Sequence, residues 1–136
     1  MLRTAKSLAA IATLTLVLQL SGCTAPTGDD VTGVWVNPDG GRLSVKADGT
    51  FTAENLPRRY FFDRRNRTDP PVSGAGTWNL QEMSGQWRVT LAFRPMSGYP
   101  TGFAAQALVH GSGEATQLFG WNEGDEIQYY KLRKAR

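Results

Sequence analysis

Apolar and polar residues alternate along much of this chain, and this alternation restricts the fold more than any other feature. The pattern is clearest in residues 87–93, where Trp, Val, Leu and Phe occupy every second position and Arg, Thr and Ala lie between them. Residues 43–46 alternate in the same way. A period of two with one polar face is typical of an antiparallel sheet that buries its other face. The alternation therefore predicts an all-β fold.

Turn signals separate these segments at intervals of roughly 8–12 residues. The strongest is Asp48-Gly49, because the tight turn of a two-residue hairpin needs a backbone with positive φ. The expected strands are residues 31–36, 42–47, 50–55, 76–81, 86–94, 103–110, 116–121 and 126–133. They predict a single antiparallel up-and-down meander, and closure into a barrel would remove its exposed edges. An eight-stranded barrel is wide enough to be filled by side chains or to hold one small ligand.

Residues 1–22 have the features of a signal peptide. Arg3 and Lys6 give a basic start, and the 14 residues from Ser7 to Leu20 carry no charge. As a helix this stretch reaches about 21 Å, which is less than the ~30 Å hydrocarbon core of a bilayer. These proportions favour a cleaved leader over a membrane-spanning helix.

The leader ends in Leu20-Ser21-Gly22-Cys23, which resembles the bacterial lipobox: an aliphatic residue, two small residues and a cysteine. The resemblance implies transfer of a diacylglyceryl group to the Cys23 thiol and cleavage between Gly22 and Cys23. Two acyl chains hold a protein stably on a membrane. We therefore expect a lipoprotein anchored through Cys23 on the extracytoplasmic face of the cell membrane. The alternative is a secretory leader followed by an unrelated free cysteine.

Residues 24–30 are polar and contain Pro and Gly, which predicts a flexible linker after the lipidated cysteine. Residues 31–136 then form one domain, since the chain of 136 residues is too short for two ordinary ones. The whole chain has 15 basic residues, of which two lie in the leader. The remainder of the chain therefore has 13 basic and 12 acidic residues. This balance gives no reason to expect a nucleic-acid partner. We expect a monomer.

Gly33-Val34-Trp35, near the start of the first expected strand, resembles the Gly-x-Trp opening of lipocalins and related calycin-type barrels. The resemblance implies a lipocalin-like barrel in which a basic residue of the last strand packs over the tryptophan. Lys131 and Arg133 are the candidates for that role, and Gly33, Trp35 and Arg133 form the expected structural motif.

Two turn segments carry a second resemblance. The segments Asp-Gly-Gly-Arg-Leu (39–43) and Asp-Gly-Thr-Phe (48–51) look like those of small lipoproteins from high-GC Gram-positive bacteria, the actinobacteria. This resemblance implies an extracytoplasmic location and a barrel, and it implies no particular activity.

An Arg-rich insertion, residues 57–75, interrupts the succession of strands. It holds five arginines and three aromatic residues within ten positions, and long insertions in a compact domain are often functional. Arginine beside aromatic rings suits phosphate groups and headgroup boundaries, so an acidic protein, an anionic lipid or a cell-wall polymer are possible partners. The alternative is a solvated loop whose aromatic residues cap the barrel. The candidate residues are Arg58, Arg59, Tyr60, Phe61, Phe62, Arg64, Arg65 and Arg67.

Four tryptophans are many for a chain of this length. Aromatic side chains at a barrel mouth can bind a small apolar ligand, and the alternative is that they fill the core. The candidates for a ligand site at the mouth are Trp78, Phe119, Trp121 and Tyr129. We expect a non-enzymatic module that binds a small apolar ligand, and interaction through the Arg-rich insertion is the alternative function.

Catalytic and metal-binding patterns are weak. His110 is the only histidine, and no nucleophile with an orienting carboxylate lies near it in the sequence. Residues 111–113, Gly-Ser-Gly, do not form the Gly-x-Ser-x-Gly nucleophile motif. Single carboxylates lie near the expected strand ends, at Glu54, Glu82, Glu114 and Glu126. A spatial pair of carboxylates remains an open alternative, but we expect no enzyme, no cofactor and no metal site.

Overall fold

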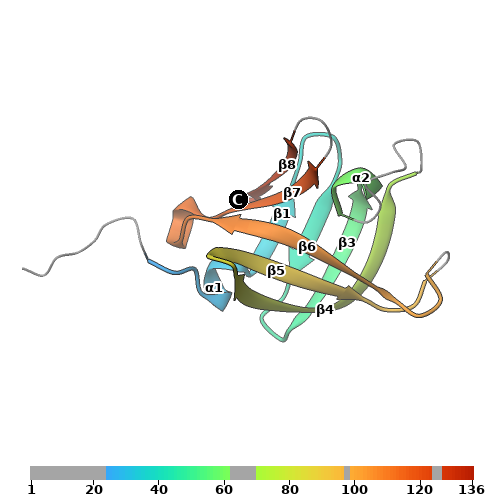
Figure 1. Cartoon of the computed structure of the whole chain (residues 1–136), viewed down its shortest axis with the longest axis horizontal. Coiled ribbons are helices and arrows are strands. Elements are labelled where there is room, and N and C mark those ends of the chain that lie inside the picture. Colours follow the sequence, from blue (N-terminus) through green and yellow to red (C-terminus); the bar gives the residue numbers. More distant parts are fainter. Residues whose placement is uncertain (1–23, 62–69, 97–98, 124–126) are drawn as a thin grey trace, which may run out of the picture.

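The computed structural model describes residues 24–61, 70–96, 99–123 and 127–136, and the leader, Gly22 and Cys23 lie outside these ranges. Figure 1 shows an all-β molecule in which eight antiparallel strands form one closed barrel. The strands are β1 (Gly33–Val36), β2 (Arg42–Val45), β3 (Thr50–Leu56), β4 (Val72–Met83), β5 (Gln86–Phe93), β6 (Phe103–His110), β7 (Gln117–Glu123) and β8 (Ile127–Lys134). Three short helical segments accompany them: α1 (Gly28–Val31), α2 (Arg58–Phe61) and η1 (Gly113–Ala115).

Each strand pairs with the next in the sequence, and β8 returns to β1 through the pairs Trp35↔Lys134 and Val36↔Arg133. The predicted up-and-down meander that closes into a barrel is therefore confirmed. It matches a lipocalin-like architecture at the level of strand number and order.

The hairpin predicted at Asp48-Gly49 joins β2 to β3. Gly49 has φ +86°, a conformation that glycine adopts without steric cost. The Asp48 carboxylate accepts hydrogen bonds from the backbone N–H and the hydroxyl of Thr50, at 2.9 and 2.6 Å. These bonds lower the pKa of the Asp48 carboxyl below its usual value.

Residues 28–30 were predicted as part of a flexible linker, and the structure places them in α1 instead. The Thr27 N–H donates to the Asp30 carboxylate at 2.9 Å, which completes hydrogen bonding at the start of this turn. The Val31 side chain is fully buried. The buried valine attaches the turn to the barrel, and Pro26, just before the turn, is buried as well.

Strand β4 begins at Val72, four residues before the predicted start, so the Arg-rich insertion ends before residue 72 rather than at residue 75. The alternation is hidden here because two inward positions are glycines. A Cβ on Gly74 would lie 2.9 Å from the Phe93 ring, so the missing side chain makes room for that ring. A strand whose inward residues are glycines gives no apolar signal in the sequence.

The barrel interior is filled by side chains. The Phe51 and Phe93 rings meet edge to face with centroids 4.8 Å apart. The buried core consists of residues between Val31 and Leu132, and it includes Trp35, Leu43, Val45, Phe51, Leu56, Val89, Leu91, Leu118 and Leu132, each no more than 1 % exposed. Among the described helices, none is long and apolar enough to cross a membrane.

Trp35 lies at the end of the barrel that α1 covers. Its indole N–H donates to the Val31 carbonyl at 2.8 Å, and the Lys134 ammonium lies 5.4 Å from its ring centroid. Neither predicted residue takes this position: Arg133 pairs with Val36 and its side chain is exposed, and the Lys131 ammonium lies over Phe119. Alternate residues of β8 face the interior, and that face ends at Lys134. A Cβ on Gly33 would lie 2.6 Å from Lys134 Cε, so the glycine leaves room for the lysine.

Candidate functional site

The ladder between β6 and β7 is short and opens toward one end of the barrel. The strands pair over Leu108–His110 of β6 and Gln117–Phe119 of β7. Among the described residues, no Cα pair joins the rest of β6, residues 103–107, to β7. Figure 1 shows the two strands moving apart, with α2 beside the end of β7. The separation leaves space that side chains of α2 enter.

Phe61 of α2 occupies part of this space. Its side chain is 6 % exposed and meets Tyr130 of β8 edge to face, with centroids 5.7 Å apart. Tyr60 stacks on the same tyrosine at 5.3 Å. Gly120 of β7 is buried, and a Cβ there would lie 2.6 Å from Phe61 Cζ. The missing side chain at Gly120 therefore gives the Phe61 ring its place.

Tyr130 connects α2 to the turn between β1 and β2. Its hydroxyl donates to the Asp39 carboxylate, which also accepts the Gly41 N–H at 2.9 Å. Burial and the neighbouring Asp39 charge both raise the pKa of the Tyr130 hydroxyl above its usual value. Tyr130 is therefore neutral at physiological pH, and it holds Tyr60 and Phe61 against the barrel.

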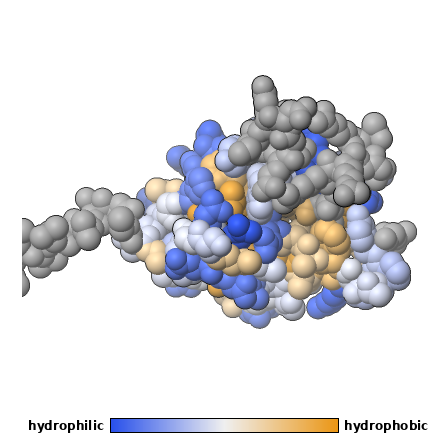
Figure 2. All heavy atoms as spheres, in the orientation of Figure 1, coloured by the Kyte–Doolittle hydropathy of each residue, from blue (hydrophilic) through white to orange (hydrophobic). Residues whose placement is uncertain are grey.

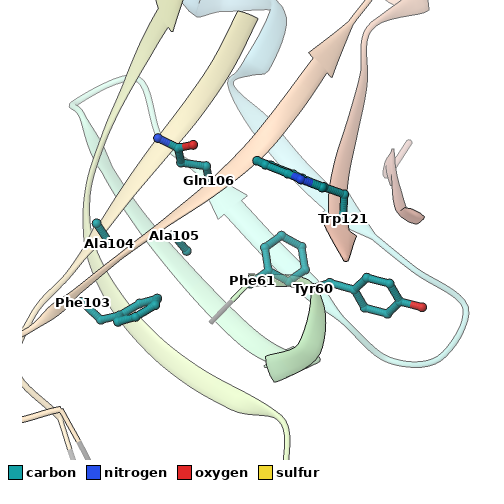
Figure 3. Close-up of a pocket in the computed structure, with 7 residues that line it drawn as sticks. All are labelled: Tyr60, Phe61, Phe103, Ala104, Ala105, Gln106 and Trp121. Carbon is teal, nitrogen blue, oxygen red and sulfur yellow. The ribbon is translucent and has the colours of Figure 1, made fainter. Parts of the chain in front are cut away.

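A pocket of about 190 Å³ lies beside Phe61, where β6 and β7 separate. In Figure 3 the Phe61 ring stands between Trp121 on one side and Phe103 on the other. Aromatic rings supply most of the lining, and Gln106 adds an amide. The lining residues are Tyr60, Phe61, Phe103, Ala104, Ala105, Gln106 and Trp121. This is the candidate ligand site of the described chain.

Four aromatic residues were predicted as candidates for a ligand site at the barrel mouth, and they lie apart in the structure. Trp78 donates its indole N–H to the Lys46 carbonyl at 2.8 Å and lies near Gly28 of α1. The other three are on the outer side of β7 and β8, and of these Trp121 alone lines the pocket. The four candidates do not meet at one mouth, because β7 turns Leu118 and Gly120 inward and its aromatic residues outward. The three outer residues are Phe119, Trp121 and Tyr129.

Those outer aromatic side chains form a cluster with two cations. The Phe119 ring lies 5.9 Å from the Tyr129 ring, and the Lys131 ammonium lies 5.9 Å from the Phe119 centroid. The Arg88 guanidinium of β5 lies 5.4 Å from the Trp121 ring. Cations at these distances are attracted to the electron-rich faces of aromatic rings.

The beginning of the Arg-rich insertion packs against the barrel. Arg58 donates to the Pro70 carbonyl at 2.9 Å and to the Tyr99 hydroxyl at 2.8 Å. The Arg59 guanidinium lies 4.7 Å from the Tyr60 ring. Tyr60 and Phe61 contact Tyr130, as described above, so four of the eight candidate residues are engaged within the fold. The other four lie outside the described residues: Phe62, Arg64, Arg65 and Arg67.

His110 is exposed at the end of β6, with its ring 4.9 Å from Phe119. Of the four single carboxylates, Glu54, Glu82 and Glu114 are exposed and Glu126 lies outside the described residues. Within the described ranges, no group of three His, Cys, Asp or Glu residues is placed to hold a metal ion. The groups that line the described pocket are aromatic rings, two alanines and one amide.

Comparisons with known proteins give no relative. No protein-family model, no curated protein and no solved structure matches this chain. Any function assigned to it rests on its own residues and on the geometry of this barrel.

Proposed function

We propose that the chain is a lipid-anchored extracytoplasmic binding module that takes a small, mainly apolar ring compound in the pocket beneath α2. The observation that carries the proposal is the pocket itself, because aromatic side chains from three different elements converge on it. Tyr60 and Phe61 come from α2, Phe103 from β6 and Trp121 from β7. Rings in a concave site bury apolar ligand surface, and one amide is enough to orient a polar substituent.

The size of the pocket limits the ligand class. A protein cavity of roughly 150 Å³ lined by apolar residues accepts benzene, whereas sites for drug-sized molecules run from roughly 300 to 1,000 Å³. The pocket of about 190 Å³ beside Phe61 therefore fits a single ring with small substituents. The Gln106 amide oxygen accepts from Arg88 at 2.8 Å and its N–H₂ group donates to Met83 Sδ at 3.7 Å, which leaves one N–H to donate to a hydroxyl or carbonyl oxygen on that ring.

The membrane anchor is the second part of the proposal. The lipobox resemblance at residues 20–23 supports acylation of Cys23, and α1 begins only five residues later, at Gly28. Five residues reach at most about 18 Å. The barrel would therefore stay close to the bilayer surface, where small apolar compounds partition.

Binding can be tested on residues 24–136, which contain every core residue. We expect p-cresol, a single ring with one hydroxyl, to give a saturable calorimetric signal and to quench tryptophan fluorescence. Ala105→Val places two methyl groups toward the pocket and should weaken binding. Ala107→Val, two residues along the same inward face, adds the same volume away from the lining and is the matched control. Equal affinity in both variants, or no binding to the unmodified domain, would refute the pocket as a ligand site.

The anchor is tested in the full chain. Changing Cys23 to Ser should move the protein from the membrane fraction to the soluble fraction or leave the leader uncleaved. A C23S variant that is processed and membrane-bound like the unmodified chain would show that the lipobox resemblance is misleading.

A further inference from the structure

The outer surface of strands β4 to β8 is a second face that the pocket does not explain. Figure 2 shows hydrophilic and hydrophobic residues interspersed on the side of the molecule where β5 and β6 lie in front. The burial pattern of each strand identifies the outward positions, since they alternate with the buried ones. Among the described side chains at these positions, three are cations and none is a carboxylate. The cations are Arg88, Lys131 and Arg133.

One row of this face crosses all five strands. The register pairs Gln81 with Arg88, Arg88 with Leu108, Leu108 with Phe119, and Phe119 with Lys131. Neighbouring strands lie roughly 4.8 Å apart, so the row is about 19 Å long. Leu108, in the middle of the row, is only 6 % exposed, so the exposed surface comes from the side chains around it. A row of this length matches an extended polymer better than it matches a single small molecule.

Aromatic rings and amides lie on this row and on either side of it. Tyr129 is the most exposed aromatic residue here, at 55 %, and it pairs across the strands with Trp121. The Gln106 amide accepts a hydrogen bond from Arg88 at 2.8 Å, and its N–H₂ group donates to Met83 Sδ at 3.7 Å and has a second N–H. Four more amides occupy outward positions: Asn79, Gln81, Gln86 and Gln117. Side-chain amides donate and accept hydrogen bonds at one site, as a hydroxyl-rich ligand requires.

We propose that this outer face binds an acidic polysaccharide. The apolar C–H face of a sugar ring packs on an aromatic ring such as Tyr129, and the sugar hydroxyls exchange hydrogen bonds with the amides. Arg88 and Lys131 supply the attraction for the carboxylate of an acidic sugar. The face shares Gln106 and Trp121 with the pocket, but Arg88, Lys131 and Tyr129 are outside the pocket lining, so the proposal holds whether or not the pocket binds a ring compound.

Four probes separate sugar recognition from simple charge attraction. The domain of residues 24–136 is run through native gels or titrated in a calorimeter with polygalacturonate, dextran, poly-L-glutamate or phosphatidylglycerol vesicles. Polygalacturonate carries sugar rings and charges, dextran has rings without charge, and polyglutamate has charge without rings. We expect polygalacturonate to bind at least about tenfold more tightly than either of the others, a difference of roughly 1.4 kcal/mol.

Variants locate the binding on the proposed face. We expect Lys131→Gln to weaken polygalacturonate binding several-fold, whereas Arg42→Gln, which removes an exposed cation from β2, should leave it unchanged. Tyr129→Ser should also weaken binding, and Tyr129→Phe should restore it because the ring is retained. The Tyr129 side chain is largely exposed, so these changes leave the core intact.

Three other outcomes would overturn the proposal. Equal binding to polyglutamate would show charge attraction alone, and binding only to the vesicles would assign the face to a membrane surface. Equal loss in the Lys131 and Arg42 variants would place the polysaccharide elsewhere on the barrel. Loss of p-cresol binding with polygalacturonate binding intact would remove the pocket function and leave this one standing.

Discussion

The Phe61 ring occupies the space that a side chain at Gly120 would fill, since a Cβ on the glycine would lie 2.6 Å from Phe61 Cζ. The two residues come from different elements, α2 and β7, and they are nearly sixty positions apart in the sequence. Phe61 thus belongs to the barrel core although it lies outside every strand. Its position also forms one wall of the pocket.

A methyl group at position 120 tests this relationship directly. Gly120→Ala must move the buried Phe61 ring, and overpacking of this kind costs about 1–3 kcal/mol. Urea denaturation followed by tryptophan fluorescence would measure the loss. Gly28→Ala is the control, because its Cβ would make an ordinary contact of 3.7 Å with Trp78. Similar stabilities of the two variants would mean that Phe61 does not fill this space in solution.

Lys134, rather than Arg133, should stabilise the end of the barrel at Trp35. Lys134→Gln removes the cation from the indole face, and such an interaction contributes about 0.5–1 kcal/mol at an exposed site. Arg133→Gln changes an exposed residue beside it and should stay within about 0.5 kcal/mol of the unmodified domain. Thermal unfolding of both variants in the same buffer compares them. A larger effect at Arg133 would contradict the placement of Lys134.

Tyr130 should make stability depend on alkaline pH. The pKa of its hydroxyl is raised in the folded state, whereas in the unfolded chain it is close to 10. The stabilisation is therefore complete below pH 10 and is lost as the pH rises above 10, where the unfolded chain gives up its proton more readily. Urea midpoints measured between pH 8 and 11 should fall more steeply for the unmodified domain than for Tyr130→Phe. If the urea midpoints of the two proteins fall equally as the pH rises, Tyr130 does not have this role.

Arg58 should hold α2 on the barrel through its bonds to Pro70 and Tyr99. Arg58→Met keeps the aliphatic stem and removes both hydrogen bonds, each of which contributes about 1 kcal/mol. The amide of Tyr60, which bonds to the Pro57 carbonyl at 3.2 Å, should then exchange its hydrogen faster. Arg42→Met, at an exposed position on β2, should not change that rate. Unchanged exchange in the Arg58 variant would show that the aromatic contacts alone hold α2.

The strand pattern could be predicted because alternation and turn residues are local properties. Residues 103–110 were predicted as a strand, and β6 has the same bounds. The side of each strand that faces inward could not always be predicted. In β7 the larger aromatic residues, Phe119 and Trp121, face outward, while Gly120 faces inward because Phe61 fills that space. No local pattern in β7 reveals a ring that comes from α2.

Individual residues of the candidate site could be predicted from the sequence, but their arrangement around the pocket could not. Trp121 was selected from the sequence for its chemistry, and it does line the pocket. Ala105 and Gln106 were not selected, because an alanine and a glutamine in a strand carry no signal of their own. Their role depends on where β6 and β7 separate, and that follows from the packing of α2 rather than from either strand.

The uneven pairing around the barrel has a consequence for how it assembles. Hairpin β7–β8 is joined internally from Leu118 to Glu123, but it meets β6 only over Leu108–His110 and β1 only at Trp35 and Val36. Strands β1 to β6 each pair with the next in one continuous antiparallel sheet. The β7–β8 hairpin thus closes a six-stranded sheet through short ladders on both sides. We expect this hairpin to open as one cooperative unit, so that its amides exchange hydrogen before those of the sheet.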